Sequence, residues 1–210
     1  FPEKEVVGIG LSEPLYHLLS YWNESILDLA YTHFNDWIRS SLRQRMEQET
    51  HLHVDAFCAV TLPALAEQRF GVAKGVNNFF CVELPNGIGC PIFCKGRVVS
   101  GANGVAGELG HTVVDTIEPD DAPCYCGKPG CVEQRTSFLA LEQNIRAALD
   151  RGVSSLLRAD YQPGRPLSVQ QIRAALNQGD RLCRHYVSLM TQRLGVAIAN
   201  AVNLLNPELV

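Results

Sequence analysis

Apolar residues follow two different patterns along this chain, and the pattern changes near residue 137. Before that point many apolar residues come in short runs bounded by glycine, proline or asparagine, which is typical of strands and turns. After it they recur every three or four residues, which predicts amphipathic helices. The predicted strands lie at 6–11, 52–54, 78–84, 91–94 and 97–99. The predicted helices lie at 37–47, 61–70, 138–149, 169–176 and about 180–205.

A mixed first half followed by helices indicates an α/β protein built as two lobes. We expect residues 1–74 to belong to a small N-terminal lobe. Residues 75–210 should form a larger lobe that carries a cysteine-rich segment and the last helices. The chain begins at Phe1 rather than at a methionine, and an apolar run is just beginning where it stops at Val210. We therefore expect a fragment that lacks its first strands and its last elements.

Composition and charge narrow the function classes. With 210 residues, of which 46% are hydrophobic and 19% charged, the chain has the make-up of an ordinary globular protein. No run approaches the roughly 18 apolar residues of a membrane-spanning helix, and we see no signal peptide, so we expect a cytoplasmic protein. The 22 acidic residues outnumber the 18 basic ones and give a net charge of −4. The chain by itself is therefore a poor candidate for binding DNA.

The eight cysteines divide into a scattered group and a cluster. The scattered cysteines lie in apolar surroundings, where we expect small buried side chains: Cys58, Cys81, Cys90, Cys94 and Cys183. The clustered ones, Cys124, Cys126 and Cys131, cannot all pair with one another, and we favour a metal site over a disulfide framework. A structural zinc ion needs four ligands, and His111, 13 residues before Cys124, is the candidate for the fourth. The alternative is a cluster of reduced thiols without metal.

The cluster is part of a longer motif that resembles a known family. Residues 107–111 read Gly-Glu-Leu-Gly-His, and residues 124–133 follow the pattern Cys-x-Cys-Gly-x-x-Gly-Cys-x-Glu. Together they resemble the signature of the ROK family, named for repressors, open reading frames and kinases. The resemblance extends to the segments 64–67, 86–89 and 194–208.

This resemblance implies a fold and a set of site residues. The fold is a two-lobed actin-like, ribonuclease-H-like ATPase fold with a sugar cleft between the lobes. Glu108, His111 and Glu133 stand where the family binds sugar hydroxyls, and His111 would also hold the structural zinc. Carboxylates suit this role because they accept hydrogen bonds from hydroxyl groups. The resemblance also implies a homodimer or homotetramer.

Two positions depart from the pattern of the family's kinases. Those kinases carry an Asn-Asp pair before the helix at 61–70, and the Asp is the general base; here Cys58 and Ala59 stand at these positions. Alanine cannot accept a proton, and we do not expect Asp55 to replace the lost base from the preceding strand. The family's second phosphate loop is also altered, because Pro85 and Pro91 flank Gly87 to Gly89 and lack the N–H groups that bind phosphate.

We therefore expect a sugar-responsive transcriptional regulator of the repressor branch that has lost kinase activity. Its effector would be a sugar or sugar phosphate, and DNA would be bound by a winged-helix domain outside this chain. One alternative is a divergent ATP-dependent sugar kinase of the glucokinase or N-acetylhexosamine kinase type. The other is a protein that binds neither sugar nor ATP and signals through a protein partner.

Overall fold

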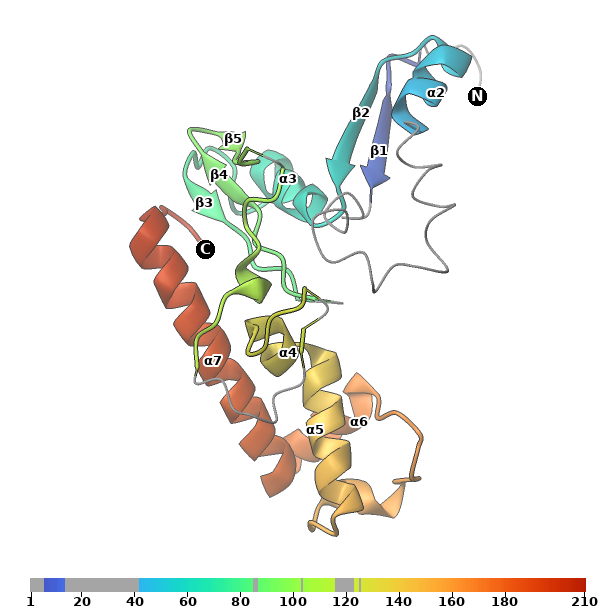
Figure 1. Cartoon of the computed structure of the whole chain (residues 1–210), viewed down its shortest axis with the longest axis vertical. Helices are drawn as coiled ribbons and strands as arrows, with labels where there is room; N and C mark the ends of the chain where they lie inside the picture. The colour runs from blue at the N-terminus through green and yellow to red at the C-terminus, as the bar shows by residue number, and fades with distance from the viewer. Residues whose placement is uncertain (1–5, 14–41, 85–86, 103, 116–122, 125) are drawn as a thin grey trace.

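The computed structural model describes residues 6–13, 42–84, 87–102, 104–115, 123–124 and 126–210 (Figure 1). The strands are β1 (Ile9–Glu13), β2 (Val54–Cys58), β3 (Phe79–Phe80), β4 (Ile92–Cys94) and β5 (Arg97–Val98). The α-helices are α2 (Leu42–Thr50), α3 (Thr61–Phe70), α4 (Val132–Thr136), α5 (Phe138–Asp150), α6 (Val169–Asn177) and α7 (Arg181–Leu205). The described residues also include two 3₁₀ turns, η3 (Leu109–His111) and η4 (Leu156–Ala159). The first part of the helix predicted at 37–47 lies outside the described residues.

The first sheet consists of β1 and β2, which pair in parallel from Ile9 opposite Val54 to Glu13 opposite Cys58. The strand predicted at 52–54 was wrong in its bounds, because the ladder with β1 begins at Val54 and runs on to Cys58. The prediction of a buried strand at 6–11 was also wrong at its start. Val6 and Val7 are 60% and 86% exposed, since they precede the ladder and are not covered by it.

The second sheet has the antiparallel order β3-β4-β5, as the turn signals predicted, but its first strand is shorter than the sequence indicated. The prediction of 78–84 fails after Phe80 because Pro91 faces Cys81. The Cys81 N–H donates to the Pro91 carbonyl at 3.1 Å, and proline has no N–H to return. Pairing resumes only as an isolated bridge between Glu83 and Gly89.

A small core joins this sheet to α3. The rings of Phe79 and Phe93 stack with centroids 4.3 Å apart, and the fully buried Ala64 of α3 packs in the same cluster. As predicted, α3 carries Pro63 in its first turn and ends before Gly71. The prediction that the scattered cysteines are buried is confirmed for Cys90 and Cys183, whereas Cys58 and Cys81 are half-buried. Cys94 is exposed, because alternation along β4 turns Phe93 inward and Cys94 outward.

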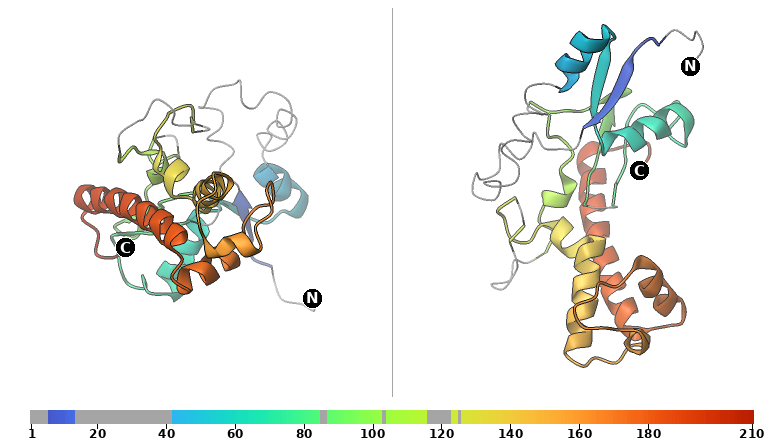
Figure 2. Two further views of the ribbon diagram at one scale, coloured as in Figure 1. Left: turned by 90° about the horizontal axis from the view of Figure 1, so that it is seen from below. Right: turned by 90° about the vertical axis from the view of Figure 1, so that its right-hand side faces the viewer.

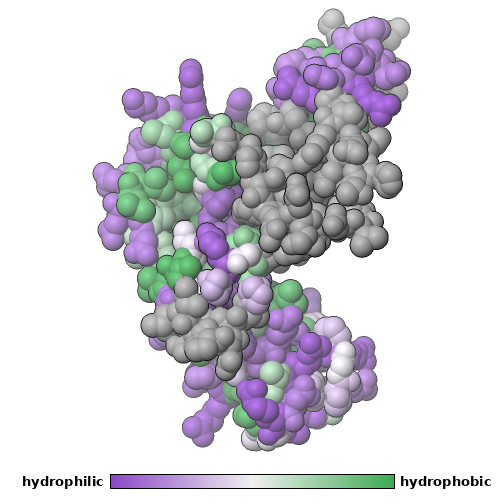
Figure 3. All heavy atoms as spheres, in the orientation of Figure 1, coloured by the Kyte–Doolittle hydropathy of each residue, from purple (hydrophilic) through white to green (hydrophobic). Residues whose placement is uncertain are grey.

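The helices predicted after residue 137 are confirmed, with bounds within two residues of the prediction. They enclose a core around the buried Ile145, Leu149 and Ile172. The 25-residue α7 runs from this helical end of the molecule to the β3–β5 sheet (Figures 1 and 2), where Leu209 forms a parallel bridge with Phe79. On the face seen in Figure 3, the helical end is mainly hydrophilic, and hydrophobic residues gather over β3–β5. No helix among the described residues is long and apolar enough to cross a membrane.

Asp180 caps α7 and should make stability depend on pH. Its Oδ1 accepts the Cys183 N–H at 2.8 Å and its Oδ2 accepts the Leu156 N–H at 2.7 Å. Burial alone would raise the pKa of this carboxyl, but these hydrogen bonds outweigh it and lower the pKa. The stabilisation is therefore present above the unfolded-state pKa of about 3.9 and is lost as the pH falls through the lower folded-state pKa.

Urea unfolding at several pH values tests this prediction. Below about pH 4 the free energy of unfolding should fall more steeply for the wild type than for Asp180→Asn, because the amide cannot take up the proton. Asp160→Asn removes an exposed acid and should follow the wild-type curve. Parallel curves for the wild type and Asp180→Asn would contradict the prediction.

Candidate metal and ligand site

Two tight backbone segments position the four side chains that could hold a metal ion. The first is the η3 turn, which ends at His111 and whose Gly110 N–H donates to the Ile88 carbonyl at 3.3 Å. The second is the loop before α4, which is closed by the Cys124 N–H on the Lys128 carbonyl at 2.9 Å. Gly127 and Gly130 of this loop have φ values of +85° and +77°, which favour glycine.

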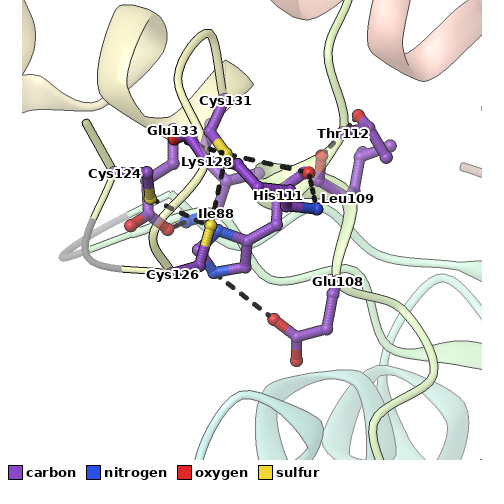
Figure 4. A network of polar contacts seen from close by, with 10 residues as sticks. All are labelled: Ile88, Glu108, Leu109, His111, Thr112, Cys124, Cys126, Lys128, Cys131 and Glu133. Carbon is purple, nitrogen blue, oxygen red and sulfur yellow. Dashed lines mark hydrogen bonds and ion pairs between the residues drawn. The ribbon is translucent and has the colours of Figure 1, made fainter. Parts of the chain in front are cut away.

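The structure brings the four predicted ligands together. The donor atoms of His111, Cys124, Cys126 and Cys131 all lie within 4.8 Å of one another (Figure 4). His111 Nδ1 is 3.5 Å from Cys124 Sγ, and Cys126 Sγ is 3.6 Å from Cys131 Sγ. Tetrahedral zinc, with bonds of about 2.3 Å to sulfur and 2.0 Å to nitrogen, separates its ligand atoms by roughly 3.5–3.8 Å. The donor set and its spacing therefore fit such an ion.

Burial sets the protonation of these ligands when no metal is bound. His111 is 7% exposed, and burial lowers its pKa, which favours the neutral imidazole that a metal requires. Burial also raises the pKa of Cys124, and burial together with the neighbouring Cys126 and Cys124 raises the pKa of Cys131 to about 12. Metal binding must therefore displace thiol protons, as is usual for cysteine sites.

Glu108 connects the cluster to a cavity. Its Oε2 lies 3.7 Å from His111 Nε2, so the imidazole faces the thiols with one nitrogen and a carboxylate with the other (Figure 4). A carboxylate that hydrogen-bonds this second nitrogen orients a metal-bound histidine, and Glu108 lies on that side of the ring at slightly more than hydrogen-bond length. Burial and the charge of Glu133 raise the pKa of Glu108. Glu108 also lines a cavity of about 320 Å³, and it is the only carboxylate among the lining residues that the structure describes.

The other side of this cavity is the corner between β2 and α3. Cys58, the last residue of β2, lines the cavity together with Thr61, and burial raises the pKa of the Cys58 thiol. Ala59 follows in the exposed turn. Asp55 lies on β2, as expected, and its Oδ1 is 3.1 Å from His53 Nε2. Asp55 is not among the residues that line the cavity.

Glu133 and Lys128 make contacts that the sequence did not predict. Glu133 is 9% exposed, and its Oε2 accepts the Ile88 N–H at 2.8 Å. A Cβ on Gly87 would lie 2.8 Å from that oxygen, so a side chain there would push the carboxylate away from the Ile88 N–H. Lys128 Nζ donates to the His111 carbonyl at 3.3 Å. Neither His111 nor Glu133 is among the lining residues of the Glu108 cavity.

The sequence of this chain is similar to those of known proteins. Residues 3–210 match the model of the ROK family. A glucokinase from Halalkalibacterium halodurans is 31% identical over 207 residues, which are 98% of this chain and 60% of that protein. The DNA-binding transcriptional dual regulator NagC of Escherichia coli is 35% identical over 145 residues, or 69% of this chain and 34% of that protein.

Solved structures give the same result. The crystal structure of a ROK family transcriptional regulator, a homolog of the E. coli Mlc protein, superposes with a TM-score of 0.70 at 34% identity. The match covers 80% of this chain and 40% of that structure. The chain therefore spans between about a third and three fifths of the relatives it matches. Repressors and glucokinases both occur among them.

Proposed function

Since this chain belongs to the ROK family, we propose that it is the sugar-binding effector part of a transcriptional regulator without kinase activity. The observation that carries the proposal is Ala59. In the family's kinases this position, just after β2, holds the aspartate that takes the proton from the sugar hydroxyl. Alanine has no group for this step, and loss of a positioned general base typically costs about 10²–10⁴ in rate. Asp55 supplies no substitute at the cavity, since its carboxylate bonds His53 on the exposed side of β2.

The proposed effector is a sugar or sugar phosphate held near Glu108, His111 and Glu133. Glu108 is best placed to bind the sugar, because it lines the cavity and its carboxylate also lies beside the His111 imidazole. We further propose that the residues 1–74 and 75–210 belong to two lobes that flank the sugar. Sugar would shift the protein between open and closed forms only if it binds one of them more tightly.

We propose a structural zinc ion on His111, Cys124, Cys126 and Cys131. Their four donor atoms leave no open position for a reacting water, so the ion would contribute folding energy and orient His111. DNA would be bound by a domain outside this chain, which agrees with the net charge of −4. A homodimer or homotetramer completes the proposal.

Ligand-induced stabilisation of the natural full-length protein tests the sugar site. A hexose or hexose phosphate at 100 times its dissociation constant should add about 2.7 kcal/mol to the free energy of unfolding. Glu108→Gln should remove most of this gain. Asp55→Asn, which replaces an acid outside the cavity, should keep it. If no sugar stabilises the wild type, the sugar-effector proposal is wrong and a protein partner becomes the better explanation.

A divergent sugar kinase is the second candidate. It is favoured by the glucokinase relative, whose match covers more of this chain than the NagC match does, and by the presence of Glu108, His111 and Glu133. An assay of hexose phosphorylation discriminates the two candidates. It compares the wild type with Ala59→Asp and with the double variant Ala59→Asp, Cys58→Asn. The regulator proposal expects phosphorylation only after the aspartate is introduced, whereas the kinase candidate expects it in the wild type.

A further inference from the structure

Three charged side chains from separate segments meet at Asp115. Its Oδ2 accepts a hydrogen bond from Arg135 Nη1 at 3.1 Å and another from Arg193 Nε at 2.9 Å. Asp115 follows η3, Arg135 belongs to α4, and Arg193 lies in α7. One carboxylate oxygen therefore ties the segment after His111 to two helices that pack against each other.

The backbone places this junction next to the metal ligands. Val113 forms an antiparallel bridge with Cys131, and the Val132 N–H donates to the Thr112 carbonyl at 2.9 Å. The short stretch that begins at His111 and ends at Asp115 thus lies alongside the start of α4. Cys124 and Cys126 lie in the sequence between the two bridged residues, Val113 and Cys131. If the stretches at 111–115 and 131–135 separate, His111 moves away from Cys131.

Of the three side chains at this junction, Arg135 alone is largely buried. The Arg135 side chain is 9% exposed, compared with 37% for Asp115 and 30% for Arg193. Exposed pairs contribute little because water screens them. A network of several charges is the exception, and here one carboxylate oxygen joins two guanidinium groups. The cluster therefore favours one arrangement of the loop ends relative to α7.

We propose that Asp115, Arg135 and Arg193 form a positioning cluster that holds the backbone at 112–115 against α4 and α7 and slows the loss of metal from His111, Cys124, Cys126 and Cys131. This inference rests on the proposed zinc site. The three residues act through the backbone at 112–115 and 131–135, not as ligands. They also connect the backbone just after His111 to the long helix that reaches the helical end of the molecule (Figure 1).

The rate at which zinc passes from the natural full-length protein to a chromogenic chelator tests the cluster. We expect Arg135→Gln, Arg193→Gln and Asp115→Asn each to release zinc at least about tenfold faster, the lower end of the loss seen when groups that support metal ligands are removed. Arg146→Gln is the matched control. It breaks a pair of 3.7 Å with Glu142 within α5, outside the Asp115 cluster, and should leave the rate unchanged.

The double variant gives an independent check. Because both arginines bond the same oxygen, adding Arg193→Gln to Asp115→Asn should change the release rate little further. A purely structural tie would lower the unfolding midpoint without changing zinc release at 25 °C. Arg193 is partly exposed, so its replacement keeps the test decisive if the Arg135 variant does not fold.

The inference would be overturned if the Arg193 and Asp115 variants released zinc at the wild-type rate, or if Arg146→Gln accelerated zinc release as much as they do. Either result would leave the zinc site intact. A wild-type protein that holds no zinc would instead overturn the proposed metal site, and the inference with it.

Discussion

Replacing Cys131 by serine should abolish metal retention and lower the free energy of unfolding by more than about 4 kcal/mol, the range associated with loss of a structural metal. Cys131 is fully buried between His111 and α4, and its sulfur lies 3.6 Å from that of Cys126. Structural zinc binding is worth on the order of 10 kcal/mol in small zinc domains, because the site forms only on folding. A hydroxyl in place of one thiolate removes a large part of this energy.

Metal analysis and urea unfolding of the natural protein check this result. Cys94→Ser is a suitable control, since Cys94 is exposed on β4 and is not in the His111 cluster, the group of candidate ligands among the described residues. It should change stability by no more than about 0.5 kcal/mol, as surface substitutions usually do. A Cys131→Ser protein that keeps one zinc ion per chain would contradict the proposed ligand set.

Gly107→Ala should destabilise the protein by more than about 3 kcal/mol, because two costs coincide at this position. Gly107 has a φ of +92°, and a non-glycine residue in such a conformation costs of order 1–3 kcal/mol. In addition, its Cβ would lie 2.1 Å from the Cys90 carbonyl oxygen. The Cys90 N–H donates to the Gly107 carbonyl at 2.9 Å, so neither backbone can move without breaking this bond. Glu108 is the next residue and should lose its place at the cavity.

Gly75→Ala separates the two costs. Gly75 has a similar φ of +84°, but nothing lies within 4 Å of its Cβ position. Urea unfolding should therefore show a much smaller loss of stability for Gly75→Ala, limited to the cost of the backbone conformation, about 1–3 kcal/mol. Equal losses for the two variants would show that the close approach to Cys90 carries no weight.

The clustering of His111 with three cysteines could be predicted from the sequence because their spacing and residue types are local. Cys124, Cys126 and Cys131 lie in one short loop, and His111 ends a short turn upstream. The helices after residue 137 were equally predictable, since their apolar faces repeat at a regular period and Asp180 caps the longest of them.

Contacts between distant segments could not be predicted. The bond from Ile88 to Glu133 spans 45 residues, and that from Arg193 to Asp115 spans 78. No periodicity or motif marks such pairs, although Gly87 is a signal of close backbone approach. The shortened β3 depended on the register that sets Pro91 opposite Cys81, which only the folded sheet defines.

The most direct test of the account is ADP formation by the unmodified full-length protein, supplied with magnesium ATP and a panel of hexoses. With alanine at position 59, we predict no hexose-dependent ADP, even with a hexose that stabilises the protein against unfolding. Hexose-dependent turnover in the usual enzymatic range of about 1–10³ s⁻¹ would contradict the loss of kinase chemistry and establish the sugar kinase instead.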